Sequence, residues 1–208
     1  MLWLQGVGCT GCTISLLDYI SPTAPVDAAD VLINYINLAY APNLTSVAGE
    51  AAVSIVEQVK DAGHYLLAVE GGVPTGFGGG ACFAWSVGGI EVTFAEAVQD
   101  LASRAKAILC IGACSAYGGI PAAPPNPSGV VSVRSLTGRS TINVAGCPPH
   151  PDWIVWTIVQ LLLDRTVSLD GWGRPRTIFG KKYTTNVLAG QILIRRSRNQ
   201  EFVVNPVA

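Results

Sequence analysis

Four cysteines in this chain stand just after hydrophobic runs that have the character of β-strands. The runs and cysteines are, in chain order, residues 2–7 before Cys9 and Cys12, residues 107–111 before Cys114, and residues 141–145 before Cys147. In a parallel α/β sheet the carboxyl ends of the strands open onto one crevice, where ligands bind. Four thiolates are the ligand set of a 4Fe–4S cluster. The pattern therefore predicts that distant segments meet at one iron–sulfur site.

The Cys-x-x-Cys motif does not identify that site by itself, because redox dithiols, zinc sites and clusters all use it. A structural zinc site usually has a second close pair of ligands, whereas Cys114 and Cys147 are single cysteines. A redox dithiol would explain Cys9 and Cys12 and leave the other two without a role. The spacing favours a cluster and leaves zinc open as the alternative.

The predicted elements alternate between strand and helix. Besides the three runs above, strands are predicted at residues 31–39 and 64–69, and helices at residues 12–19, 50–61, 94–105 and 152–164. Apolar residues recur at helical spacing in residues 50–61, and Thr93 with Glu96 forms a capping-box signature. This alternation predicts an α/β fold with a doubly wound parallel sheet.

Two segments do not fit the alternation. Residues 71–89 are rich in glycine and are predicted to form a long functional loop, although no nucleotide-binding glycine motif is present. Residues 166–208 contain two short runs of strand character, 191–195 and 201–204, which suggest a hairpin or an arm. We therefore divide the chain into a domain of residues 1–165 and an irregular C-terminal extension or arm of residues 166–208.

Composition points to a protein partner. Of the 208 residues, 50% are hydrophobic and 13% are charged, compared with about 25% charged residues in ordinary soluble domains. A surface so poor in charge predicts a large interface with another subunit. The net charge of −1, with no long basic run, argues against nucleic acid as a partner.

The sequence predicts no transmembrane segment, because the longest apolar stretch, residues 154–163, is short and is interrupted by Thr157 and Gln160. Met1 lies one residue before the first strand, which leaves no room for a secretion signal. We expect a cytoplasmic protein that meets a membrane only through its partners.

Three further residues have two interpretations each. Glu70 ends an apolar strand, where it either accepts hydrogen bonds from amides of the glycine-rich loop or lies at a subunit interface near a proton path. Cys110 falls inside a strand and is expected to be a buried apolar residue. Cys82 lies in the glycine-rich segment and is a weaker candidate for a position near the cluster.

Four motifs resemble the small subunit of NiFe hydrogenases, in the order found in that family. They are Trp3-Leu4-Gln5-Gly6 leading into Cys9-Thr10-Gly11-Cys12, then Val69-Glu70-Gly71-Gly72-Val73-Pro74, Gly112-Ala113-Cys114-Ser115-Ala116-Tyr117-Gly118-Gly119, and Gly146-Cys147-Pro148-Pro149-His150-Pro151-Asp152-Trp153. The resemblance covers about residues 1–180. It implies a flavodoxin-like domain whose proximal 4Fe–4S cluster is held by Cys9, Cys12, Cys114 and Cys147. It also implies a large-subunit partner with the NiFe centre, which splits molecular hydrogen while this chain moves the electrons.

The chain departs from longer members of that family at its C-terminal end. Those members carry further cysteines for medial and distal clusters, whereas no cysteine follows Cys147 here. The resemblance therefore implies one cluster, whose electrons pass to or from a further redox subunit or carrier. Gly11 and Gly119 stand where oxygen-tolerant members have extra cysteines, which implies an ordinary 4Fe–4S cluster.

Two other functions stay open. The first is the related cluster subunit of respiratory complex I or of energy-converting hydrogenases, although complex I relatives have adjacent cysteines in the first motif and Thr10-Gly11 separates them here. The second is a scaffold that binds a partner without conducting electrons.

Overall fold

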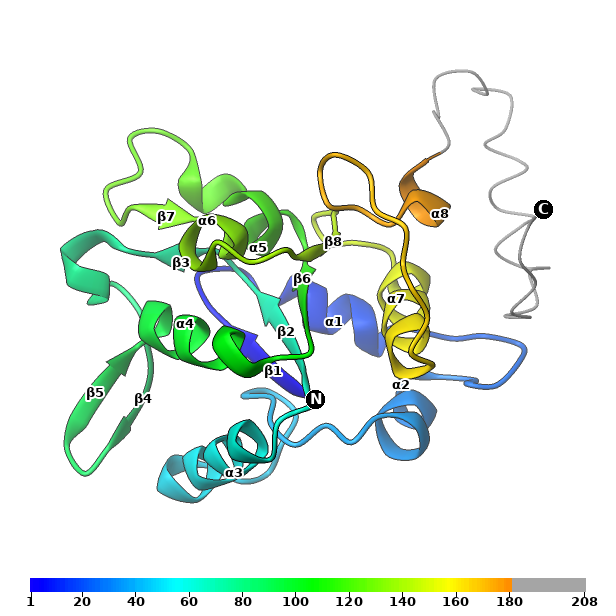
Figure 1. The fold of residues 1–208 in the computed structure, drawn as a ribbon, viewed down its shortest axis with the longest axis horizontal. Helices are drawn as coiled ribbons and strands as arrows, with labels where there is room; N and C mark the ends of the chain where they lie inside the picture. The colour runs from blue at the N-terminus through cyan, green and yellow to red at the C-terminus, as the bar shows by residue number, and fades with distance from the viewer. Residues whose placement is uncertain (181–208) are drawn as a thin grey trace.

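The computed structural model describes residues 1–180, and a parallel sheet of four strands lies at its centre (Figure 1). In spatial order the strands are β1 (Leu2–Gln5), β2 (Leu66–Glu70), β6 (Ala107–Ile111) and β8 (Ile142–Val144). The last paired residues, Gln5, Glu70, Ile111 and Val144, are matched in one row across the sheet. The α/β fold and the three strands predicted before the cysteines are confirmed.

Helices cover both faces of this sheet, and alternate strand residues pack against each set. On one face, Trp3 and Ala68 join a core that includes α1 (Gly11–Leu17), α2 (Ala28–Asp30) and α7 (Pro151–Leu162). On the other face, Leu67 and Val69 join a core that includes α3 (Gly49–Ala62), α4 (Phe94–Arg104), α5 (Ala113–Tyr117) and α6 (Val133–Thr137). Strands buried on both faces need the continuous apolar runs seen in the sequence.

The strand predicted at residues 31–39 is wrong. Asp27 caps α2 by accepting a hydrogen bond from Asp30 N at 2.7 Å, and the chain continues from α2 into a π-helical turn, η1 (Val31–Tyr35). Just beyond the run, at the outer edge of β1, Tyr40 forms a single parallel bridge with Leu2. With that bridge in the place of strand 2, the order matches the flavodoxin-like order 2-1-3-4-5.

The glycine-rich segment, expected to be a loop, contains regular structure instead. The strand β3 (Val73–Pro74) pairs with β7 (Val130–Val131), and a 3₁₀ turn, η2 (Gly76–Gly79), follows. A hairpin of β4 (Phe83–Val87) and β5 (Ile90–Thr93) comes next. Gly88 and Gly89 both have positive φ, as the favoured two-residue hairpin turn requires. A second 3₁₀ turn, η3 (Ile120–Ala122), follows α5.

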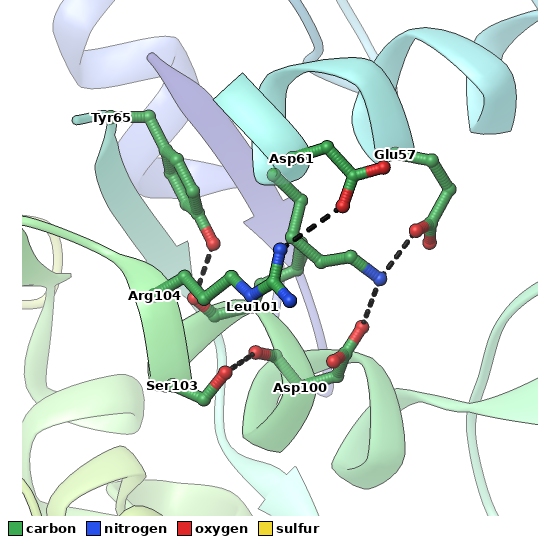
Figure 2. A network of polar contacts seen from close by, with 8 residues as sticks. Glu57, Asp61, Tyr65, Asp100, Leu101, Ser103 and Arg104 are labelled. Atoms are coloured by element: carbon green, nitrogen blue, oxygen red, sulfur yellow. Dashed lines mark hydrogen bonds and ion pairs between the residues drawn. The ribbon is translucent and has the colours of Figure 1, made fainter. Parts of the chain in front are cut away.

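The helices α3 and α4 are joined by polar contacts on the surface (Figure 2). Lys60 on α3 contacts Glu57 on its own helix and Asp100 on α4, and Arg104 pairs with Asp61 at 3.1 Å. The predicted capping box at the start of α4 is confirmed, with Glu96 N donating to Thr93 Oγ1 at 3.2 Å. Exposed ion pairs contribute at most about 1 kcal/mol each, so apolar packing holds these helices in place.

The chain after α7 runs along the free edge of β8. Asn143 N donates to Gly173 O at 2.7 Å, and the Asn143 side chain donates to Trp172 O at 2.8 Å. The short helix α8 (Arg176–Phe179) then packs Phe179 against Trp153 of α7. The two strands predicted at 191–195 and 201–204 lie outside the described residues. Within residues 1–180, no helix is long and apolar enough to cross a membrane.

Burial of Cys110 predicts an alkaline loss of stability. Burial raises the pKa of this thiol from its ordinary value of 9.0 to about 12, so the unfolded chain loses the proton first. The contribution of the protonated Cys110 thiol to the free energy of unfolding is full below about pH 9. It is lost as the pH rises toward 12, at about 1.4 kcal/mol per pH unit. We expect the unfolding free energy of the reduced chain to fall more steeply over this range than that of Cys110→Ala, as measured by urea denaturation. If the unfolding free energies of the two proteins fell in parallel with pH, the raised pKa of Cys110 would be contradicted.

Candidate iron–sulfur site

The first two cysteines lie in the connection between β1 and α1. Cys9 is exposed, while Cys12 is half-buried as the second residue of α1. Thr10, between them, adopts a left-handed conformation with φ of 66°. The Gln5 side chain, at the end of β1, donates a hydrogen bond to the Thr10 hydroxyl. The turn therefore presents both thiols at the carboxyl end of β1.

The other two cysteines follow neighbouring strands. Cys114 is the second residue of α5, directly after β6, and Cys147 is an exposed residue between β8 and α7. Ala113 N donates to Gly146 O at 2.7 Å, and Gly112 N donates to Val144 O at 2.9 Å. These bonds extend the pairing of β6 and β8 into the two loops and hold the loops side by side.

Two side chains fix the first loop to the rest of the site. The Ser15 hydroxyl on α1 donates to Pro149 O, beyond Cys147, at 2.7 Å. Glu70, at the end of β2, accepts a hydrogen bond from Cys12 N at 3.0 Å. Glu70 is only 2% exposed, so it is not part of the surface of the described chain, and the proton path of its second interpretation stays a prediction. The expected contact with loop amides is present, although the amides belong to the first cysteine loop.

The four thiols are close enough to influence one another electrostatically. Burial, followed by the charges of Glu70, Cys114, Cys9 and Cys147, raises the pKa of the Cys12 thiol well above its usual range. Burial also raises the pKa of Cys114, with Cys147 and Cys9 as the next causes. Four thiolates gathered in this way repel one another unless a positively charged group lies among them, and an iron–sulfur core supplies that charge.

Glycines around the sulfur atoms keep the space between them open. A Cβ atom on Gly112 would lie 2.5 Å from Cys12 Sγ, and one on Gly119 would lie 2.8 Å from Cys114 Sγ. None of the four cysteines is in a disulfide. Free thiols from three loops, with side-chain-free backbone between them, are a donor set that fits a 4Fe–4S cluster.

A site for one metal ion has a different geometry. Among residues 1–180, no group of three or more His, Cys, Asp or Glu side chains converges as ligands of a single ion do. In a 4Fe–4S cluster each of the four thiolates binds a different iron atom, so the thiolates are spread around the cluster.

Three other residues with thiol or imidazole side chains have other surroundings or contacts. Cys110 is fully buried within β6, as expected, and Cys82 packs against the core on the α4 face of the sheet. His150 caps α7, accepting a hydrogen bond from Asp152 N at its Nδ1 atom at 3.3 Å. The sequence analysis did not predict Trp3 and Thr13 as hydrogen-bond partners of Glu70. The one feature that could have indicated them is that the first and third predicted strands are neighbours in a flavodoxin-like sheet.

Comparison with known proteins identifies the class of protein that this fold and site define. A family model described as "NADH ubiquinone oxidoreductase, 20 Kd subunit" matches residues 9–161. A chain of the [NiFeSe] hydrogenase from Desulfovibrio vulgaris Hildenborough superposes with a TM-score of 0.83 at 35% identity, covering 89% of this chain and 71% of that one.

Two relatives of known name indicate to which members of this class the chain is similar in sequence. The periplasmic [NiFeSe] hydrogenase small subunit of Desulfomicrobium baculatum is 37% identical over 205 residues, covering 89% of this chain and 64% of the relative. The periplasmic [NiFe] hydrogenase small subunit of Solidesulfovibrio fructosivorans is 39% identical over 184 residues, covering 87% and 55%. The chain therefore belongs to the family whose model matches it, and within that family it stands among the NiFe hydrogenase small subunits. The resemblance of its four motifs to those subunits is confirmed. The chain spans between about half and two thirds of the length of these relatives.

The open space at Gly112 generates a prediction. Gly112→Ala places a methyl group against Cys12 Sγ at a backbone φ of 91°, so we expect the four thiols to retain less iron after anaerobic purification. Gly138→Ala is the matched control, because its φ is 66° and a Cβ there meets nothing within 4 Å. It should lose about 1–2 kcal/mol of stability and keep its iron. Equal iron content in the two variants would contradict the close approach of Gly112 to Cys12 Sγ as a requirement of the site.

Proposed function

We propose that this chain is the electron-transfer small subunit of a NiFe hydrogenase. It holds a single proximal 4Fe–4S cluster through Cys9, Cys12, Cys114 and Cys147. The cluster relays electrons between the NiFe centre of a large subunit and an acceptor or donor during the reversible oxidation of molecular hydrogen. The observation that carries the proposal is the gathering of four free thiols at the carboxyl ends of β1, β6 and β8.

Each part of the site has a defined task in this function. When bound, the cluster supplies one-electron chemistry. The four cysteines hold it, while the backbone bonds between the loops of Cys114 and Cys147 keep those two ligands in register. The Ser15–Pro149 contact ties α1 to the fourth ligand. A frame fixed in both redox states needs little rearrangement when an electron enters or leaves.

The partner surface lies around the same thiols. Cys9 and Cys147 are exposed, and large apolar side chains surround the ligand-bearing loops: Ile14 on α1 is 55% exposed and Ile120, next to Gly119, is 80% exposed. An apolar rim around an exposed redox site is suited to a large subunit that covers it. The relatives are themselves named small subunits. A further redox subunit or carrier is proposed as the second electron partner.

The first alternative is the complex I-like cluster subunit. The description of the family model favours it, whereas hydrogenase small subunits at 37% and 39% identity favour our proposal. The scaffold alternative is disfavoured because all four thiols are present and gathered. The cytoplasmic location stays a prediction, since these two relatives are named as periplasmic.

Metal analysis of the intact complex tests the function directly. We expect nickel, together with iron for an active site and at least one cluster, in the complex purified anaerobically through this chain. Iron without nickel would contradict the hydrogenase function and favour the complex I-like subunit or the scaffold.

Substitution of a single ligand tests the cluster. We expect Cys114→Ser to lower cluster occupancy and to uncouple hydrogen oxidation from dye reduction, because the electron path begins at this site. Cys82→Ser is the matched control, since it changes a half-buried cysteine that packs on the core instead. Unchanged dye reduction in Cys114→Ser, with full cluster occupancy, would refute the ligand assignment.

A further inference from the structure

Glu70 is a buried carboxylate whose hydrogen bonds are concentrated on one ligand loop. It ends β2 and is 2% exposed. Its Oε1 atom accepts from Cys12 N at 3.0 Å and from Thr13 N at 3.3 Å. Its Oε2 atom accepts from Thr13 N at 3.2 Å, from Trp3 Nε1 at 3.3 Å, and from the Thr13 hydroxyl. Every contact is a donor directed at the carboxylate.

This pattern is the one an ionised carboxylate fills, because that group only accepts hydrogen bonds. Burial of a carboxylate is costly unless such donors surround it, and among residues 1–180 no cationic side chain is a hydrogen-bond partner of Glu70. Neutral donors thus hold the negative charge. Since Cys12 N is itself one of these donors, the charge lies beside a ligand of the proposed cluster.

The same contacts direct two backbone amides away from the cluster. Hydrogen bonds to cluster sulfur and the net charge nearby both set the reduction potential. The amides of Cys12 and Thr13 point at Glu70, so they are directed to the carboxylate instead of to sulfur. A buried anion also opposes the arrival of an electron. Both effects act in the same direction, toward a lower potential.

We propose that Glu70 is a positioning residue that orients the Cys12 turn and, through its fixed negative charge, lowers the reduction potential of the cluster. This inference rests on the proposed function. The step concerned is the uptake of one electron by the oxidised cluster, delivered from hydrogen oxidation on the partner or from dithionite in a titration. In that step the electron passes to the cluster, and Glu70 acts through its charge and its contacts alone.

A redox titration of the complex at pH 8, followed by the electron paramagnetic resonance signal of the reduced cluster, tests the role of the charge. We expect Glu70→Gln to shift the potential upward, because the charge is removed while the side chain keeps its length. Glu96→Gln is the matched control. It also removes a carboxylate that accepts from a backbone amide, at the start of α4, and should leave the potential unchanged.

Thr13→Val is expected to shift the reduction potential in the opposite direction. It leaves Glu70 in place and removes the hydroxyl that donates to it, so the less neutralised charge should shift the potential downward. This variant decides the matter if Glu70→Gln fails to fold or to hold a cluster. A residue that only supports the fold would give no such pair of opposite shifts.

The outcomes separate the two levels of the proposal. If the unaltered complex holds no cluster, the proposed function fails and this inference fails with it. If the cluster is present and the potentials of Glu70→Gln and Thr13→Val equal that of the unaltered complex, or if Glu96→Gln shifts as far as Glu70→Gln, only the role of Glu70 is overturned. Opposite shifts in the two variants, with the control unchanged, support it.

Discussion

The parallel pairing of four strands in one register is the constraint on which the site depends. Gln5, Glu70, Ile111 and Val144 form a single row across the sheet, so three ligand-bearing loops and Glu70 begin at the same height. Each loop needs only a short turn to bring its cysteine forward. Because backbone hydrogen bonds fix the row, thiols that are distant in the sequence meet without long connecting segments.

Burial of the sheet on both faces gives the site its rigidity and also its electrostatic character. Strand residues alternate between two apolar cores. Among the described residues near the ligands Glu70 is the buried carboxylate, and five hydrogen-bonding contacts stabilise it. In a low-dielectric surrounding such a charge acts more strongly than it would at the surface, so one residue can both hold a loop and tune a redox centre.

The exposure of two proposed ligands shapes the place of the chain in the proposed electron path. Exposed Cys9 and Cys147, with Ile14 and Ile120 nearby, place the proposed cluster at a surface. An electron could therefore enter and leave the proposed cluster through contacts with other subunits.

The sequence by itself determined the strands before the cysteines and the capping box of α4, because apolar runs and local capping patterns act over a few residues. It also predicted the four thiols of the proposed site. Tertiary structure decided the rest. Residues 31–39 have strand composition, yet a capped helix continues into them, and the chain meets the edge of β1 at Ala39 and Tyr40. Glu70 finds its donors at Cys12 and Thr13, 58 and 57 positions away at the start of α1, and at Trp3 of β1, since β1 and β2 become neighbours only in the folded sheet. Pairing across the sheet is a long-range interaction, and local sequence does not encode which loop a buried carboxylate will meet.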